Sequence, residues 1–136
     1  MQSLYIIRGP IGSGKSTLAA AIAMGLRTVD IEAVVCENDD YFIDAGVYKF
    51  DQTRVHESRR ACTDKAIRAL DDGKTAIVSN CFVHPSHHAE IETYAHVRGI
   101  PVQIVICQGD FQNVHGVEQQ RVQASREFFV YTTNRN

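Results

Sequence analysis

Several features that would narrow the function are missing from this chain of 136 residues. Basic residues do not exceed acidic ones, with 14 Lys and Arg against 16 Asp and Glu, so no overall positive field attracts nucleic acid, although a local groove can still be basic. The four cysteines form no C-x-x-C pair, which argues against a disulfide framework. No apolar run approaches the roughly 20 residues that a membrane-spanning helix needs.

The composition that remains is typical of one domain with a buried core. Hydrophobic residues make up 44% of the sequence and charged residues 22%, and we expect a single domain over residues 1–136. Arg8 and the glycine-rich segment behind it interrupt any apolar N-terminal run, so no secretory signal is expected and a cytoplasmic location is predicted. Cys36 and Cys107 are expected to be small buried hydrophobic residues in a reducing compartment.

Residues 9–16 read Gly-Pro-Ile-Gly-Ser-Gly-Lys-Ser and fit the Walker A pattern G-x-x-x-x-G-K-[ST] at every fixed position. An apolar run at 4–7 precedes this loop and a strong helix-forming segment follows it, which is the setting that the motif requires. The alternative is an incidental Gly/Ser turn that caps a helix, but the Lys15–Ser16 pair stands in register with the motif.

The chemistry of this loop predicts ATP with Mg2+ as its ligand. Glycines permit positive φ angles and bring backbone N–H groups close to phosphate. Lys15 supplies a charge for the β- and γ-phosphates, the Ser16 hydroxyl is the expected Mg2+ ligand, and Thr17 either bonds the α-phosphate or starts the helix. The nucleotide-binding residues predicted in this loop are Gly9, Gly12, Ser13, Gly14, Lys15, Ser16 and Thr17.

Strand-like and helix-like segments alternate along the chain. Strands are predicted at 4–8, 33–37, 75–79 and 102–107, and helices at 15–26, 52–72, 86–98 and 117–130. This alternation predicts parallel βαβ units with right-handed crossovers. We therefore expect a three-layer α/β domain of the P-loop NTPase type, with a central parallel sheet of about four strands and a short lid. Ligands should bind beyond the carboxyl ends of the strands.

A pair of carboxylates, Asp39 and Asp40, follows the second predicted strand. Beside a triphosphate, one carboxylate can accept the proton of an attacking hydroxyl, and the other can bond backbone or a metal-bound water. The alternative is an acidic turn whose Asn and Asp residues serve turn formation alone. The position of the pair, directly after the strand that follows the P-loop helix, favours a catalytic function.

Residues 9–17 and the segment Asn38-Asp39-Asp40-Tyr41, together with segments 46–51, 79–85 and Asn113-Val114-His115-Gly116-Val117, resemble the polynucleotide 5′-hydroxyl kinase family of P-loop kinases. The resemblance covers nearly the whole chain. The Walker A match is shared by many NTPases, whereas the Asp-Asp-Tyr and Asn-Val-His-Gly-Val matches are much more specific.

The resemblance implies transfer of the ATP γ-phosphate to the 5′-hydroxyl of a nucleic acid end or nucleotide. It places Asp39 as general base, Lys15 as the second catalytic residue and Ser16 at the triphosphate and Mg2+ site. His115 lies within the lid signature, where it either touches nucleotide or packs within the lid, which we expect over 109–117. His115 and Arg121 complete the predicted nucleotide-binding set.

The sequence departs from that family at several positions. Ser79 and Asn80 stand where an acidic residue usually follows the third strand, which weakens support for Mg2+ there. Residues 111–112 occupy the place of a lid arginine that stabilises charge on the transferring group. Arg121 or Arg126 either substitutes for this arginine or belongs to a solvated helix face.

Residues near the expected acceptor site also leave alternatives open. Phe42 stands where a phage member of the resembled kinase family has an arginine that helps hold the acceptor strand. Phe42 or Tyr41 either stacks on a base or packs beneath its loop. Arg59 and Arg60 either meet an acceptor phosphate or form part of a solvated face.

Three histidines near the expected start of the third helix, His84, His87 and His88, suggest a metal site by their spacing. No carboxylate or cysteine completes a convincing ligand set, although Glu90 is near. We therefore expect surface histidines at a helix start.

Three functions are compatible with these patterns. The leading one is an ATP-dependent kinase for a hydroxyl of a nucleic acid or nucleotide. The second is the same chemistry with a modified nucleoside or small molecule as acceptor, because P-loop folds accept many substrates. The third is an ATP-binding module with weakened catalysis, which would bind ATP but transfer phosphate to no acceptor.

Overall fold

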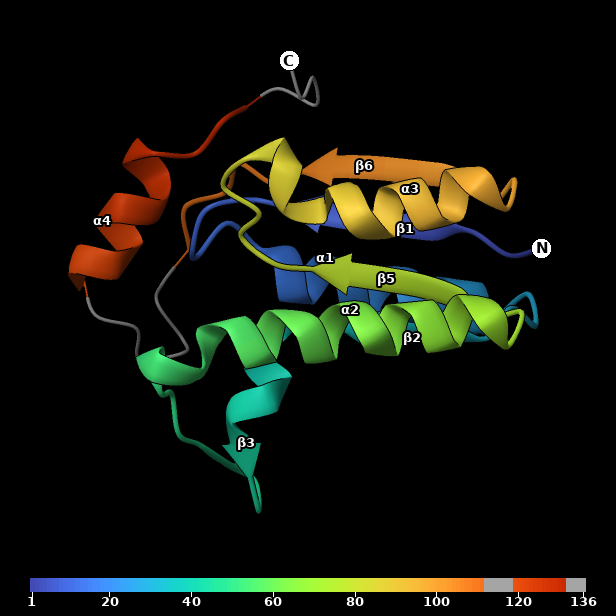
Figure 1. The fold of residues 1–136 in the computed structure, drawn as a ribbon. Coiled ribbons are helices and arrows are strands. Elements are labelled where there is room, and N and C mark those ends of the chain that lie inside the picture. The colour runs from blue at the N-terminus through green and yellow to red at the C-terminus, as the bar shows by residue number, and fades with distance from the viewer. Residues whose placement is uncertain (112–118, 132–136) are drawn as a thin grey trace.

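The computed structural model describes residues 1–111 and 119–131 (Figure 1). The strands of the main sheet are β1 (Leu4–Arg8), β2 (Ala33–Cys36), β5 (Thr75–Ser79) and β6 (Val102–Ile106). The helices are α1 (Lys15–Arg27), α2 (Val55–Asp71), α3 (Ala89–Val97) and α4 (Gln119–Glu127). A small hairpin is formed by β3 (Ile43–Asp44) and β4 (Val47–Tyr48), and short 3-10 helices are η1 (Asn38–Phe42), η2 (Gln52–Arg54) and η3 (Pro85–His88).

The main sheet is parallel, with strand order β2-β5-β1-β6. Leu4 of β1 pairs with Ala76 of β5 on one side and with Val102 of β6 on the other, so β1 is an interior strand. Its side chains alternate between the two faces, because successive residues of a strand point in opposite directions. A strand that is covered on both faces is apolar throughout, as Leu4-Tyr5-Ile6-Ile7 is.

Each face of the sheet carries its own apolar cluster. Leu4 and Ile6 pack with residues of α2 and α3, whereas Ile7 packs with Ala19 of α1 on the opposite face. Figure 1 shows the resulting layers, with α2 and α3 on one side of the sheet and α1 on the other. The three-layer α/β fold with a four-stranded parallel sheet is therefore confirmed.

The four predicted strands are found to within one residue, and the helices differ from prediction mainly at their ends. Residues 52–54 form a 3-10 turn before α2, and the third helix begins as η3, where Pro85 occupies the first turn. The β3–β4 hairpin was not predicted. Cys36 is buried as expected, whereas Cys107 is half-buried. Among residues 1–111 and 119–131, no helix combines the length and apolarity needed to cross a bilayer.

The loops that follow the strands of the main sheet all leave the same edge, at the carboxyl ends of the parallel strands. Figure 1 shows α4 beyond that edge, separate from the three layers. The residues that follow β1, β2 and β5 therefore converge in space, and they include the loop that matches the Walker A pattern.

Candidate active site

The glycines of the phosphate loop are required by its backbone. Gly12 and Gly14 have φ angles of 82° and 95°, in the left-handed region that favours glycine. A Cβ added to Gly9 would lie 2.3 Å from Ser13 Oγ and 2.7 Å from the Cys107 carbonyl, so this glycine permits close packing of the loop against the end of β6. The Ser13 hydroxyl is buried and has no hydrogen-bond partner among the described residues.

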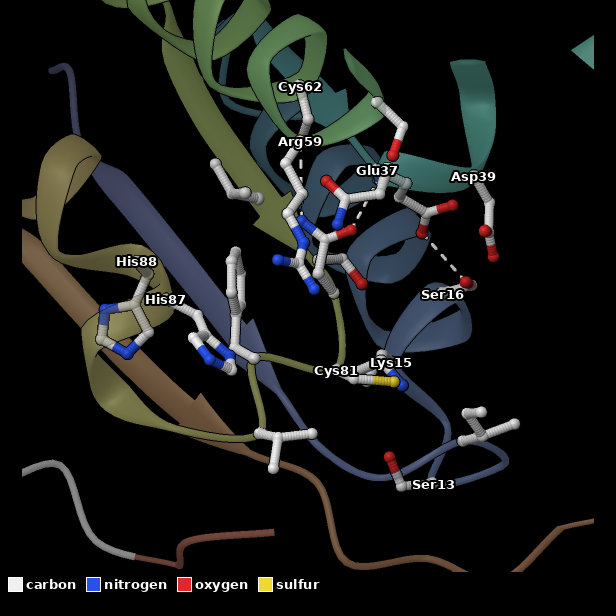
Figure 2. Close-up of a pocket in the computed structure, with 18 of the residues that line it drawn as sticks. Ser13, Lys15, Ser16, Glu37, Asp39, Arg59, Cys62, Cys81, His87 and His88 are labelled. Carbon is white, nitrogen blue, oxygen red and sulfur yellow. Dashed lines mark hydrogen bonds between the residues drawn. The ribbon is translucent and has the colours of Figure 1, made fainter. Parts of the chain in front are cut away.

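Lys15 folds back across the loop, where its Nζ donates a hydrogen bond to the Pro10 carbonyl over 3.1 Å. The Cys81 thiol lies beside it at the end of β5 (Figure 2). Burial raises the pKa of Cys81, and the nearby Lys15 ammonium opposes that rise. The hydrogen bond to Pro10 places the ammonium within the loop, where it can meet phosphate oxygens.

Ser16 has an acidic partner that the sequence analysis did not identify. Its hydroxyl donates to Glu37 Oε1 over 2.9 Å, and Glu37 directly follows β2 (Figure 2). A hydroxyl and a carboxylate are hard oxygen ligands, and Mg2+ at phosphate sites typically uses one or two protein ligands beside phosphate and water. The pair thus fits Mg2+, while no group of three or more His, Cys, Asp and Glu in the described part of the chain is arranged to hold a metal alone.

Asn80 stands where the resembled kinase family usually has an acidic residue, and its side chain bonds the neighbouring loop. Its Oδ1 accepts a hydrogen bond from the Asn38 backbone over 2.7 Å, and its Nδ2 lies 3.5 Å from Cys62 Sγ. Asn80 is 8% exposed, so an ionised carboxylate here would be desolvated. The amide therefore ties the end of β5 to the segment that bears Asp39.

Asp39 and Asp40 lie in different surroundings although they are adjacent. Asp39 lines the cavity next to the phosphate loop and accepts a hydrogen bond from the Tyr48 hydroxyl over 3.1 Å. Asp40 instead forms an ion pair with Lys65 of α2 at 3.7 Å, and Lys65 also donates to the Val35 carbonyl. Only the first carboxylate of the pair is thus placed to face a ligand in the cavity.

The aromatic residues around Asp39 pack on one another. Phe42 is 6% exposed and its ring contacts those of Tyr41, Tyr48 and Phe50 at centroid distances of 5.5, 6.5 and 5.1 Å. Phe42 therefore packs beneath its loop. Tyr41 is engaged as well, because its hydroxyl donates to Glu57 over 2.5 Å.

Helix α4 contacts the phosphate loop directly. Ser125 Oγ accepts a hydrogen bond from the Ile11 backbone N–H over 3.0 Å, and Arg126 donates to the Ile11 carbonyl over 3.3 Å. Arg126 also pairs with Asp110 at 3.1 Å. Arg126 is thus no part of a solvated face, and its guanidinium is committed to main-chain and carboxylate oxygens.

Of the other residues predicted around the lid, Arg121 lines the cavity with its guanidinium 4.1 Å from the centroid of the Phe50 ring. Phe111 is exposed and its backbone N–H donates to the Gly12 carbonyl over 2.9 Å. His115 and the segment 112–118 lie outside the described residues, so only 109–111 of the expected lid can be placed.

The two arginines of α2 differ. Arg60 makes two hydrogen bonds of 2.8 Å to Glu90 and pairs with Asp64 at 2.7 Å, so it is held on the surface of the helix layer. Arg59 makes no hydrogen bond or ion pair with another residue of the described ranges, and Figure 2 shows it reaching into the cavity. Arg60 thus belongs to the helix surface, whereas the acceptor-phosphate contact of Arg59 stays a prediction.

The prediction of surface histidines is wrong for His88. Its side chain is 1% exposed and its Nδ1 lies 3.0 Å from Glu92 Oε1, because the i,i+4 spacing brings His88, the last residue of η3, next to Glu92 of α3. His87 lies at the cavity wall with much of its side chain exposed. Partial desolvation of the imidazole and the nearby Arg59 charge lower its pKa.

These side chains line one cavity of about 1070 Å³ that runs from the phosphate loop to η3. Figure 2 shows Ser16, Glu37 and Asp39 at one end, His87 and His88 at the other, and Arg59 between them. The volume is at the upper end for small-molecule sites. The cavity has room for a triphosphate and for part of a second substrate beside it.

The AAA_33 family model, described as an AAA domain, matches residues 4–134. A relative in Pasteurella multocida (strain Pm70), the uncharacterised protein PM0531, is 28% identical over 131 residues, which span 90% of this chain and 73% of that protein. Neither description states an acceptor.

Solved structures share the fold at low sequence identity. An APS kinase CysC structure from Mycobacterium tuberculosis has a TM-score of 0.63 at 22% identity over 93% of both chains, and CysC has also been solved with AMPPNP and APS. Chaetomium thermophilum Kti12 with ADP-AlF3 has a TM-score of 0.72 at 13% identity, over 93% of this chain and 79% of that one. A chain of the Pnkp1/Rnl/Hen1 complex has a TM-score of 0.58 at 18% identity, over 79% and 35%. These likenesses establish the P-loop kinase type of fold.

Proposed function

The chain belongs to this AAA domain family, and on that premise we propose that it is an ATP-dependent phosphotransferase whose acceptor is the 5′-hydroxyl of a nucleic acid or nucleotide. The fold supports nucleotide binding, since its neighbours CysC and Kti12 were solved with AMPPNP and with ADP-AlF3. The acceptor class is supported by the motif resemblance around Asp39.

The phosphate loop performs the donor half of the reaction. Its backbone N–H groups face the phosphates, and the Lys15 ammonium neutralises charge on the β- and γ-phosphate oxygens. Ser16 and Glu37 are the residues that would hold Mg2+, which supplies further neutralisation of the phosphate charge when bound. Since phosphoryl transfer needs little covalent help from protein, this positioning is a large part of catalysis.

Asp39 performs the acceptor half. The acceptor oxygen attacks the γ-phosphorus while its proton passes to a carboxylate oxygen of Asp39. The bond between the γ-phosphorus and the β–γ bridging oxygen breaks, and ADP leaves with its new negative charge beside Lys15. The observation that carries the proposal is that Asp39 lines the same cavity as Lys15 and Ser16, whereas the adjacent Asp40 is paired with Lys65.

The test is transfer of label from γ-labelled ATP to 5′-hydroxyl DNA and RNA oligonucleotides and to mononucleotides. Asp39→Asn is expected to lower turnover by roughly 100-fold or more while ATP affinity stays within about twofold. Asp40→Asn is the matched control, because it makes the same change one residue away, and it should retain turnover within about threefold.

The other outcomes assign other functions. Label on small hydroxyl compounds alone would replace the nucleic-acid acceptor by a small molecule. Bound ATP without transfer to any acceptor would show a nucleotide-binding module, and equal turnover in wild type and Asp39→Asn would remove Asp39 as the base.

A further inference from the structure

The Asp39 carboxylate is oriented by a residue from a different element. The Tyr48 hydroxyl at the end of β4 donates to Asp39 Oδ1 over 3.1 Å, nine residues along the chain. A carboxylate that acts as base must present one oxygen to the acceptor, and a fixed hydrogen bond to the other oxygen limits its rotation. Tyr48 occupies the position that such a hydrogen bond requires.

The Tyr48 ring is itself held in place. It stacks on Phe50 with the ring planes 20° apart and the centroids 6.5 Å apart, and it meets the edge of the buried Phe42. Aromatic packing of this kind fixes a side chain through two torsions and costs little further entropy. Tyr48 is 39% exposed, and its contacts with Phe42 and Phe50 limit the rotation of the ring that carries the hydroxyl.

Arg121 of α4 contacts one of these aromatic rings. Its guanidinium lies 4.1 Å from the Phe50 ring centroid, within the range of a cation–π interaction. Burial and the Asp39 carboxylate raise the pKa of Tyr48, and the Arg121 guanidinium beside the hydroxyl opposes that rise. The Tyr48 hydroxyl thus lies beside the positive Arg121 guanidinium and donates its hydrogen bond to the negative Asp39 carboxylate.

The opposite end of α4 holds the phosphate loop. Ser125 bonds the Ile11 N–H, and residues four apart share one face of a helix, so the face that bears Arg121 at the cavity also bears Ser125 at the phosphate loop. One face of α4 therefore contacts the wall that carries Tyr48 and the loop that receives the triphosphate.

We propose that Tyr48 and Arg121 are positioning residues for Asp39, and that α4 joins the phosphate loop to the wall that orients the base. This inference rests on the proposed function, because it takes Asp39 as the general base. It gives Arg121 a role in place of the nucleotide contact predicted from the sequence. Arg121 acts through Tyr48, and Tyr48 acts through the orientation of a carboxylate.

The test compares Tyr48→Phe, Arg121→Gln and the double variant in the same transfer assay. Tyr48→Phe keeps the ring and is expected to lower kcat by about 10-fold with the KM for ATP unchanged. Arg121→Gln is expected to lower kcat by about threefold to tenfold, also without a change in the KM for ATP, and to cost almost nothing further in the Tyr48→Phe background.

Two variants serve as matched controls. Tyr94→Phe removes one hydroxyl from an aromatic ring outside the cavity, where that hydroxyl bonds Asp71 instead of Asp39. Arg98→Gln removes a cation–π contact with Tyr94, which is not among the residues that line the cavity. Both should keep kcat within about twofold.

Three results would overturn the inference while leaving the proposed function intact. The first is full kcat in Tyr48→Phe beside a deficient Asp39→Asn. The second is a raised KM for ATP in Arg121→Gln, which would make Arg121 a nucleotide ligand. The third is an undiminished effect of Arg121→Gln in the Tyr48→Phe background. The absence of transfer in wild type, or full turnover in Asp39→Asn, would instead refute the proposed function itself.

Discussion

The two walls of the cavity are built in different ways. The donor wall, formed by residues 9–16, is specified by its backbone: glycines have positive φ angles, and the main-chain groups of Ile11 bond side chains of α4. The acceptor wall, formed by residues 38–50, is specified by side chains: the Tyr48 hydroxyl bonds Asp39, and aromatic rings pack behind it. A backbone-built wall suits a ligand part that is always the same, the triphosphate, whereas a side-chain-built wall suits a part that differs between relatives.

The largest effect is expected at the donor wall. Lys15→Ala removes the ammonium that meets the β- and γ-phosphates, and transfer should fall by roughly 1,000-fold or more for every acceptor. The measurement is kcat/KM with two unrelated acceptors. A loss confined to one acceptor would contradict the division between the walls. Lys74→Ala, at an ion pair with Glu32, is the control and should remain active.

A backbone change in the same wall is expected to be the next largest. Gly14→Ala forces an alanine to a φ of 95° and places its Cβ 3.0 Å from the Phe111 ring, so ATP affinity should fall by about 10- to 100-fold. Gly25→Ala provides the opposite case within α1, because no atom lies within 4 Å of its added Cβ. That variant should bind ATP normally and unfold at a slightly higher temperature, since alanine stabilises a helix by up to about 1 kcal/mol. Unchanged ATP affinity in Gly14→Ala would show that backbone shape does not specify this wall.

Glu37 tests the junction between the two walls. Glu37→Gln removes the charge opposite Ser16, and we expect the Mg2+ concentration for half-maximal transfer to rise by about 10-fold at constant ATP. Glu32→Gln, on the exposed edge near β2, should not shift it. A normal Mg2+ requirement in Glu37→Gln would mean that Ser16 is supported by other oxygens.

The smallest effect is expected where α4 meets the phosphate loop. Ser125→Ala leaves the Ile11 N–H without its acceptor, which costs about 1 kcal/mol and should weaken ATP binding by a few fold. Calorimetric titration with a non-hydrolysable ATP analogue measures the change. Ala124→Ser, a change at the exposed residue that precedes Ser125 in α4, should bind as wild type does. Equal ATP affinities in wild type and both variants would show that the contact of α4 with the phosphate loop does not contribute to ATP binding.

The sequence predicted the donor wall better than the acceptor wall for the same structural reason. The four strands and the loop at 9–16 follow from local patterns, because apolar runs and glycine spacing determine them. The Ser16–Glu37 contact joins residues 21 apart, and no spacing rule links α1 to the end of β2. The β3–β4 turn was missed because its two central residues are Ala45 and Gly46, with φ angles of 50° and 79°. Turns with two positive φ angles are usually recognised in a sequence by Asn-Gly or Asp-Gly.

His88 shows a signal that could have been used. A histidine four residues before a glutamate on a helix predicts a side-chain pair, and such a pair can be buried where an isolated histidine is usually exposed. The position of Arg59 in the cavity had no such signal, because its neighbour Arg60 has the same charge and faces a different set of partners.

Arg8, the last residue of β1, is fully buried directly before the first glycine of the phosphate loop. Its guanidinium donates to the Phe82 carbonyl over 3.1 Å and to the Val130 carbonyl over 2.7 Å, with the Phe129 ring 4.9 Å away. Residues 129–130 belong to no helix or strand, yet they seal a cation inside the molecule. A proteolytic cut or insertion that displaced residues 129–130 would admit water beneath the phosphate loop. We therefore expect a change in this segment, far along the chain from the loop, to lower the affinity for ATP.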